Sequence, residues 1–147
     1  MIDTELIRKR KFKIVVDYAL SSAANIFPSI LGELGCEVIA LNAYVDDKKG
    51  AKTLEEFNNS LNQLSNIVVT LKADIGFLFD TGAEKVFLVD EEGNVLSGDI
   101  SLAIVLLLVL KAQPKPIIAV PVTASRIIEE MAEKYGAQVV RTKTNPH

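Results

Sequence analysis

The stretch FKIVVDYALSSAANIFPSILGELGCEVIAL, residues 12–41, decides the fold of this chain. It begins with a short β-branched run that ends at Asp17, and apolar residues then recur at helical spacing from Ile26 to Leu34. Gly35 ends that helix, and EVIAL follows as a second strand after a very short connection. A strand, a helix and a strand with tight links favour parallel pairing through a right-handed crossover. We therefore expect an α/β fold.

The next part of the chain adds a helix and a β-hairpin. Thr53 and Glu56 have the spacing of a capping box and precede an amphipathic helix. Two strands follow at residues 74–79 and 85–90, and a turn leads from them into a further short strand at residues 95–96. The predicted architecture is a three-layer α/β/α sandwich with a mixed, mostly parallel sheet that carries the hairpin.

We divide the chain into residues 1–97, which hold this sandwich, and residues 98–147, which hold a partial second α/β unit. In the second part, Asp99 is expected to cap an apolar helix at residues 100–111 that is buried on nearly every side. A strand, a helix capped by Ser125 and a last strand follow. Two parallel strands make a small sheet with an unpaired outer edge, which favours packing on the first unit or a homo-oligomer.

Composition and charge exclude several classes of function. The net charge is −3, and five basic side chains gather in residues 8–13, which leaves residues 14–147 with eleven basic and seventeen acidic side chains. We therefore expect no binding to nucleic acid. The longest apolar stretch is far shorter than the roughly 20 residues that span a bilayer, so we expect no membrane association. The only histidine is His147, which excludes a multi-histidine metal site. Without a signal peptide, the chain is predicted to be cytoplasmic.

Ligands of open α/β sheets usually bind at the carboxyl ends of parallel strands. This rule points to Asp17, Asp80 and the segment after Val122. The sequence contains neither a G-x-G-x-x-G turn nor a Walker-type loop, so a dinucleotide or nucleoside triphosphate cradle is not expected. A small-ligand site in a crevice near Asp17 and Ser22 is one hypothesis that these observations leave open.

Four segments of the chain together resemble one protein family. ADIGFLFDTGAEKVFLVD at residues 73–90, followed by EEGNVLSGD, resembles the metal loop of the α-D-phosphohexomutases, the phosphoglucomutase and phosphomannomutase family. KIVVDYA at residues 13–19 and ILGELGCEVIALN at residues 30–42 resemble the start of the family's second domain. PVTASRIIEEMAEKYGAQVVRTK at residues 121–143 resembles the opening half of the third. The resemblance implies that residues 1–97 correspond to the family's second domain and residues 98–147 to the first half of its third domain.

The resemblance also implies a metal site. In this family, three aspartates of the loop hold Mg²⁺ against the phosphate of a phosphoserine, because a hard cation prefers carboxylate oxygens. By position, Asp80 matches the first aspartate, Gly82 the second and Glu84 the third. Lys85 replaces the arginine as a cation near the phosphate. One carboxylate is missing and another is longer by a methylene, so Mg²⁺ binding is expected to be weakened or lost.

Other catalytic segments of the family have no counterpart in this sequence. The letters most similar to the phosphoserine motif TASHNP end at Ser125 and lack the following HNP, so we interpret Ser125 as a helix cap. A sugar-recognition segment similar to GEMSGH and a fourth-domain phosphate clamp are absent from the sequence. The partners that this interpretation implies are the remaining domains of a parent protein, with a sugar phosphate as candidate ligand.

Two functional hypotheses follow from the resemblance. In the first, the chain is a fragment of a phosphohexomutase-like protein of sugar-phosphate or sugar-nucleotide metabolism and is inactive by itself. Its parent would transfer a phosphoryl group between the 1- and 6-hydroxyls of a hexose. In the alternative, the chain is a non-catalytic scaffold attached to a mannose-1-phosphate guanylyltransferase. The loop at residues 80–85, which lacks two of the family's aspartates, is most similar to the loop in bacterial fusions of that enzyme with a phosphomannomutase-like region.

Overall fold

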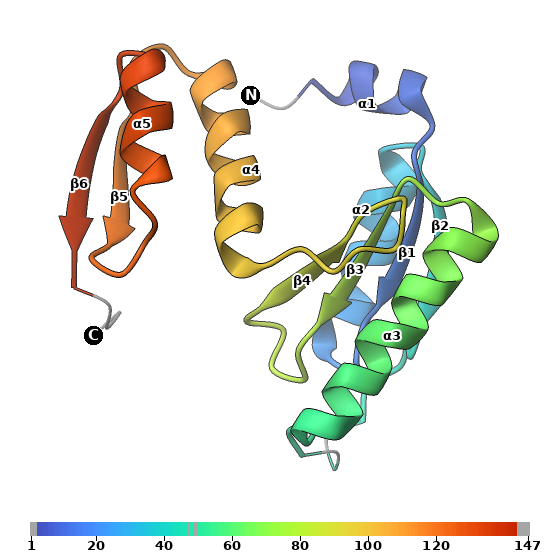
Figure 1. Cartoon of the computed structure of the whole chain (residues 1–147). Coiled ribbons are helices and arrows are strands. Elements are labelled where there is room, and N and C mark those ends of the chain that lie inside the picture. Colours follow the sequence, from blue (N-terminus) through green and yellow to red (C-terminus); the bar gives the residue numbers. More distant parts are fainter. Residues whose placement is uncertain (1–2, 47, 49, 144–147) are drawn as a thin grey trace. The chain divides into compact units, whose positions relative to one another are not determined.

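The computed structural model describes residues 3–46, 48 and 50–143, and the chain divides into two compact units, Met1–Leu96 and Ser97–His147 (Figure 1). Each unit has its own sheet and its own buried core.

The first unit contains, in chain order, α1 (Thr4–Arg10), β1 (Lys13–Asp17), the 3₁₀ helix η1 (Ser22–Asn25), α2 (Phe27–Glu33), β2 (Glu37–Leu41), α3 (Leu54–Leu71), β3 (Ile75–Phe79) and β4 (Val86–Val89). Its four-stranded sheet has the order β2-β1-β3-β4. β1 pairs in parallel with both β2 and β3, whereas β3 and β4 form an antiparallel hairpin. The predicted mixed, mostly parallel sheet is confirmed.

The strands of the first unit bury side chains on both faces of the sheet. Val15 of β1 joins a cluster with α3, whereas Ile14 and Val16 join a second cluster with residues of η1 and α2. Successive residues of a strand point to opposite faces, so α3 covers one face of the sheet and α2 the other (Figure 1). This is the predicted three-layer arrangement.

α3 begins at the predicted capping box. The Thr53 hydroxyl accepts a hydrogen bond from the Glu56 N–H at 3.2 Å, and the Glu56 carboxylate accepts one from the Thr53 N–H at 2.8 Å. Leu61, Leu64 and Val68 are then buried against the sheet. The residues that begin the helix also line the two cavities near the carboxyl ends of the strands. A local signal in the sequence therefore positions one wall of those cavities.

The second unit contains α4 (Gly98–Ala112), β5 (Ile117–Pro121), α5 (Ile127–Lys134) and β6 (Gln138–Thr142). β5 and β6 pair in parallel as a two-stranded sheet. The buried core of this unit consists of Leu106, Leu110, Val120 and Ile128. The predicted order of helix, strand, helix and strand is present, and the assignment of this unit to half of a larger domain stays a prediction.

Two predictions for α4 were wrong. Its N-cap is Ser97, whose hydroxyl accepts a hydrogen bond from the backbone N–H three residues later at 3.3 Å, and Asp99 lies inside the first turn. The helix is also not buried on nearly every side, because Leu106 and Leu110 are buried but Leu108 is 62% exposed. α4 packs beside α5 and buries only the side that joins Ile128 and Val120. The unbroken apolar run at residues 102–110 gives no sign of which side that is.

Two smaller predictions also needed correction. Val95 forms only an isolated antiparallel bridge with Val89, so the short strand predicted there is reduced to one bridge. α5 begins at Ile127, one residue later than a cap at Ser125 would give, although the Ser125 hydroxyl accepts a hydrogen bond from the Ile127 N–H at 3.4 Å. In the part of the chain that the structure describes, we find no helix with the length and apolarity needed to cross a bilayer.

Candidate functional site

The carboxyl ends of β1 and β3 meet at one edge of the first unit's sheet. The two strands are parallel, and Asp17 lies opposite Leu78. Asp17 and Asp80 therefore stand at neighbouring strand ends. The chain also switches sides at this point, since β2 and β3 flank β1. Ligands of open α/β sheets bind at such switch points, so both predicted aspartates lie at the edge where a ligand is expected.

Asp80 closes the loop between β3 and β4 with its own side chain. Its Oδ1 accepts hydrogen bonds from the backbone N–H of Glu84 at 2.8 Å and from that of Lys85 at 3.0 Å. The Ala83 N–H donates to the Asp80 carbonyl at 3.0 Å, and Ala83 has a left-handed backbone with φ of 55°. Aspartates commonly form turns by accepting such local N–H groups. In the described structure only Oδ2 of Asp80 is left for a ligand.

Gly82 and Glu84 do not complete a carboxylate cage with Asp80. The Glu84 side chain passes close to Gly82, because a Cβ built on Gly82 would lie 3.6 Å from Glu84 Cγ. Glu84 is exposed and is not among the described residues that line the cavity beside Asp80. Within residues 3–46, 48 and 50–143, no three His, Cys, Asp or Glu side chains are grouped so that they could hold a metal ion. This donor set does not fit Mg²⁺, which requires a near-octahedral arrangement of oxygens.

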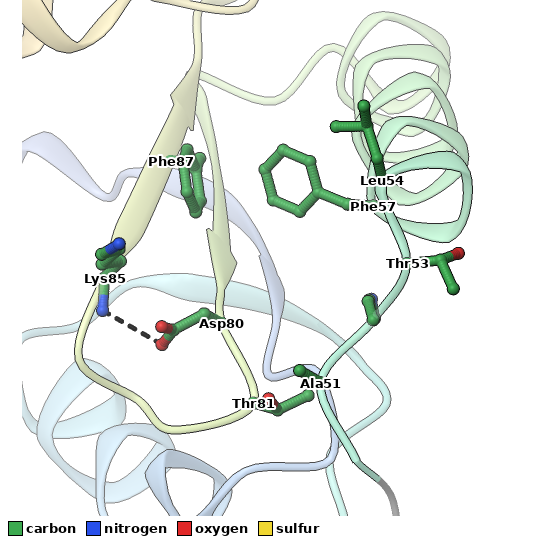
Figure 2. A pocket seen from close by; sticks show the side chains of 9 residues that line it. Ala51, Thr53, Leu54, Phe57, Asp80, Thr81, Lys85 and Phe87 are labelled. Carbon is green, nitrogen blue, oxygen red and sulfur yellow. Dashed lines mark hydrogen bonds between the residues drawn. The ribbon is translucent and has the colours of Figure 1, made fainter.

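A cavity of about 400 Å³ lies between this loop and the start of α3 (Figure 2). Phe57 of α3 and Phe87 of β4 line its apolar side, with ring centroids 4.7 Å apart in an edge-to-face arrangement. Its polar side carries Asp80, Lys52 and Lys85. Two cations and one carboxylate beside an apolar wall favour an anionic group over a divalent cation.

Asp17 holds the loop that follows β1. It is 1% exposed, and its Oδ1 accepts hydrogen bonds from the Ala19 N–H at 2.8 Å and from the Asn42 side-chain amide at 2.9 Å. Ala19, Leu20 and Asn42 have positive φ angles of 50°, 63° and 49°, which are uncommon without glycine and concentrate at functional sites. The sequence pointed to Ser22, which is exposed, and missed Asn42. The signal for Asn42 was its place directly after the second parallel strand.

Tyr18 packs close to both strand ends. Its ring is fully buried and stacks on Phe79 with centroids 6.0 Å apart, and Ala83 packs against the same cluster. The hydroxyl has no hydrogen-bond partner among the described residues, and burial raises the pKa of the phenol. Tyr18 therefore stays protonated at neutral pH.

The third predicted position, the segment after Val122, is held by Arg141. Its Nε and Nη2 donate to the Glu129 carboxylate at 2.7 and 2.9 Å. Its Nη1 donates to the carbonyls of Val122 at 2.9 Å and Ala124 at 2.7 Å. Hydrogen bonding to Arg141 lowers the pKa of the Glu129 carboxyl. The Ser125 hydroxyl accepts a hydrogen bond from the N–H of Ile127, the first residue of α5, at 3.4 Å, although the N-cap position of that helix is Arg126.

These observations define the class of protein: an α/β/α domain with an acidic loop at the ligand-binding edge of a mixed sheet. Residues 1–93 match the family model described as phosphoglucomutase/phosphomannomutase, alpha/beta/alpha domain II. This chain belongs to that family, as the motifs of the sequence indicated.

Relatives with assigned names support the family. The chain is 32% identical over 142 residues to a phosphoglucomutase/phosphomannomutase of Thermococcus kodakarensis, a match that covers 97% of this chain and 31% of the relative. It is 33% identical over 144 residues to a phosphoglucosamine/phosphogalactosamine mutase of Sulfurisphaera tokodaii, which covers 97% of this chain and 32% of the relative. The chain therefore spans about a third of the length of these relatives.

Solved structures share the fold. A phosphoglucomutase/phosphomannomutase family protein of Burkholderia thailandensis superposes with a TM-score of 0.75 at 21% identity, over 97% of this chain and 32% of that protein. The phosphoglucomutase parafusin of Paramecium gives a TM-score of 0.75 at 18% identity, over 98% of this chain and 28% of that protein. At these identities the likeness concerns the fold alone.

Proposed function

We propose that this chain is the middle portion of a phosphohexomutase-like protein of sugar-phosphate or sugar-nucleotide metabolism, and that it does not convert hexose phosphates by itself. The observation that carries the proposal is the state of the β3–β4 loop. One carboxylate oxygen of Asp80 accepts hydrogen bonds from two backbone N–H groups. Gly82 stands at the position where the resemblance expects the second aspartate of the family's metal loop. The loop lies where the family resemblance expects the metal site, and it lacks two of the three aspartates expected there.

The chemistry of phosphoryl transfer supports inactivity. Catalysis of this reaction consists mainly of positioning and of neutralising charge on the transferred group. In the described structure, Lys52 and Lys85 supply positive charge at the loop, but Asp80 beside them opposes it. Ser125, the residue most similar to a phosphoryl carrier, accepts a hydrogen bond at the start of α5. These residues can hold an anionic group but do not provide a nucleophile for it.

A scaffold role is the second candidate, and the structural use of Asp80 favours it. A loop whose carboxylate closes a turn can be kept for the stability of the domain after its catalytic use is lost. A link to a mannose-1-phosphate guanylyltransferase stays a prediction that rests on the resemblance of the loop. Sequencing the gene on both sides of this segment tests it, because a nucleotidyltransferase reading frame fused upstream is the expected result.

A turnover assay tests inactivity. The chain is incubated with glucose 1-phosphate, mannose 1-phosphate or glucosamine 1-phosphate, the matching bisphosphate and Mg²⁺, and the 6-phosphates are measured. We expect no turnover above that of the Asp80→Ala variant. Turnover by the natural chain that Asp80→Ala abolishes would contradict the proposal and support a working mutase site.

A further inference from the structure

β2 is an open edge of the first unit's sheet (Figure 1). At the opposite edge, Val95 forms a bridge with Val89 of β4 and so covers part of that strand. In the described structure, β2 pairs with β1 alone. Proteins usually protect an open edge with charged side chains or proline, but residues 38–41 of β2 contain neither. This edge can therefore pair with a further strand.

The backbone groups of β2 that face away from β1 belong to two residues. The Glu37 N–H donates to the Phe12 carbonyl at 2.8 Å, so the backbone groups of Glu37 point toward β1. Backbone groups alternate between the two sides of a strand, which turns the N–H and C=O of Val38 and Ala40 outward. Among the described residues, none forms a hydrogen bond to these outward groups.

The spacing of the outward groups is self-complementary. Val38 and Ala40 lie on either side of Ile39, so an antiparallel second copy of β2 centred on Ile39 would pair each of them with the other. Two such pairs form at the junction, and each exchanges two hydrogen bonds. The Glu37 residues of the two copies would then stand at opposite ends of the paired strands, each 3.3 Å from its own Lys13.

An apolar groove of about 370 Å³ lies beside β2 on the face of the sheet that α3 covers. Ile39 and Leu41 of β2 and Ile67 and Leu71 of α3 line it, and Leu71 is 38% exposed. In an antiparallel pairing centred on Ile39, the side chain of the second Ile39 lies on this same face. The two Ile39 side chains would meet beside the groove, and the contact would remove apolar surface from water.

The flank of α3 beside the groove carries no charge. Residues 57–71 contain no Asp, Glu, Lys, Arg or His, although 24% of the chain is charged. Asn66 and Thr70 line the groove, and Asn59 and Gln63 lie on the same flank by helical spacing. A solvated helix face normally carries charged residues, whereas the core of a protein interface is depleted of them. This flank therefore has the composition of a contact surface.

A second copy of the chain suits this surface better than a charged partner does. The chain has a net charge of −3, so two copies repel each other except where their surfaces are neutral. Amide side chains both donate and accept hydrogen bonds, so Asn66 can pair with its own copy across a twofold axis. A charged partner would find no group of opposite charge on this flank. The strand, the groove and the flank are all self-complementary, as a twofold contact requires.

We propose that β2 and the flank of α3 beside it, here called the β2–α3 face, form the contact of a symmetric homodimer. The two copies of β2 pair antiparallel about Ile39, and the two sheets join into one. One strand of 5 residues and one helix flank make a small contact, and small contacts are weak and reversible. The proposal does not depend on the proposed function, because the β2–α3 face uses no residue of the β3–β4 loop.

Sedimentation velocity of the full chain tests the proposal, at concentrations from about 10 μM to about 1 mM. The natural chain is compared with Asn66→Asp/Thr70→Asp, which puts like charges on both sides of the twofold axis. Asn58→Asp/Asn62→Asp is the matched control, because it adds the same two charges at the same spacing on α3 but away from the groove. We expect a monomer–dimer equilibrium that the first variant weakens at least about tenfold, with the control within about twofold of the natural chain.

Amide hydrogen exchange of the natural chain locates the contact. The outward N–H groups of Val38 and Ala40 face solvent in a monomer and are hydrogen-bonded in the proposed dimer. Their exchange should therefore slow as the chain concentration rises, whereas exchange in β5 and β6 of the second unit should not change.

Three results would overturn the proposal. The first is a monomer at every concentration. The second is equal weakening of the dimer by the two double variants, in chains whose circular dichroism shows an intact fold. The third is a dimer in which exchange at Val38 and Ala40 does not slow, including one whose protection appears in β5 or β6 instead. Should a variant fail to fold, the exchange of the natural chain decides alone.

Discussion

Two acidic turns stand at the opposite ends of β4, and they are built alike. Before the strand, Asp80 Oδ1 accepts the backbone N–H of Glu84, four residues later, at 2.8 Å. After the strand, Asp90 Oδ1 accepts the N–H of Asn94, also four residues later, at 2.8 Å. The aspartate that the family resemblance assigns to a metal therefore makes the same local bond as one that closes an ordinary turn.

The two turns differ in how their glycines are packed. Gly93 has φ of +87°, and a Cβ on it would lie 2.7 Å from Val69 Cγ2 and 2.9 Å from Ser65 Oγ. Gly82 has no left-handed backbone, and the nearest atom to an added Cβ is Glu84 Cγ at 3.6 Å. Packing against α3 therefore fixes the second turn, whereas Asp80 fixes the first and leaves space at Gly82. The sequence resemblance predicts the family's second aspartate at this position.

The largest effect is expected from Gly93→Ala. The new methyl must displace atoms of α3 and adopt a left-handed backbone, so we expect a loss of about 2–4 kcal/mol in unfolding free energy. Urea denaturation followed by circular dichroism measures it. A loss below about 0.5 kcal/mol would show that the second turn is as open as the first.

Asp80→Ala is expected to have the next largest effect. It leaves two backbone N–H groups without their carboxylate acceptor and should cost about 1–2 kcal/mol at this half-buried position. Asp80→Asn keeps an oxygen acceptor and should cost less. Glu84→Ala is the matched control, since the Glu84 side chain accepts no hydrogen bond in the described structure. Equal stability of natural chain and Asp80→Ala would refute the structural role of Asp80.

Asp90 in the second turn should make the stability of the fold depend on pH. Hydrogen bonds from the side chain and backbone of Asn94 lower the pKa of the Asp90 carboxyl. A carboxyl with a lower pKa in the folded state stabilises the protein above its unfolded pKa of about 3.9, and this contribution disappears as the pH falls through the folded pKa. Asp90→Asn should therefore show a flatter decline of stability below about pH 4, measured by urea midpoints from neutral to acidic pH. If stability falls with pH as steeply in Asp90→Asn as in the natural chain, the lowered pKa of Asp90 in the folded state is contradicted.

Gly82→Ala should have the smallest effect. The added methyl makes only ordinary van der Waals contact, so the change in unfolding free energy should stay within about 0.5 kcal/mol. A loss comparable to that of Gly93→Ala would mean that the loop before β4 is as tightly packed as the turn after it.

The fold could be predicted because its signals are local. The β-branched run before Asp17, the stop at Gly35 and the capping box of Thr53 each act within a few residues, and each was found in the structure. Residues 102–110 of α4 lack such a signal, since all of them are apolar and only tertiary packing decides that Leu108 is exposed.

The candidate site could be located but not fully understood from sequence. Strand ends predicted the position of Asp80, but not that its Oδ1 would accept two backbone N–H groups, which depends on the path of the loop. The hypothesis of a crevice near Asp17 and Ser22 pointed to this edge of the sheet, but it did not name Asn42 or the residues at the start of α3. The cavity there is lined by three segments that only the fold brings together.

The most direct test of this account is a calorimetric titration of the natural chain with MnCl₂ and MgCl₂, beside Asp80→Ala and the rebuilt variant Gly82→Asp/Glu84→Asp. Mn²⁺ and Mg²⁺ both prefer carboxylate oxygens. We predict no saturable binding by the natural chain or by Asp80→Ala, and saturable binding by the rebuilt variant. Saturable binding by the natural chain that Asp80→Ala abolishes would contradict the claim that Asp80 serves the turn rather than a metal.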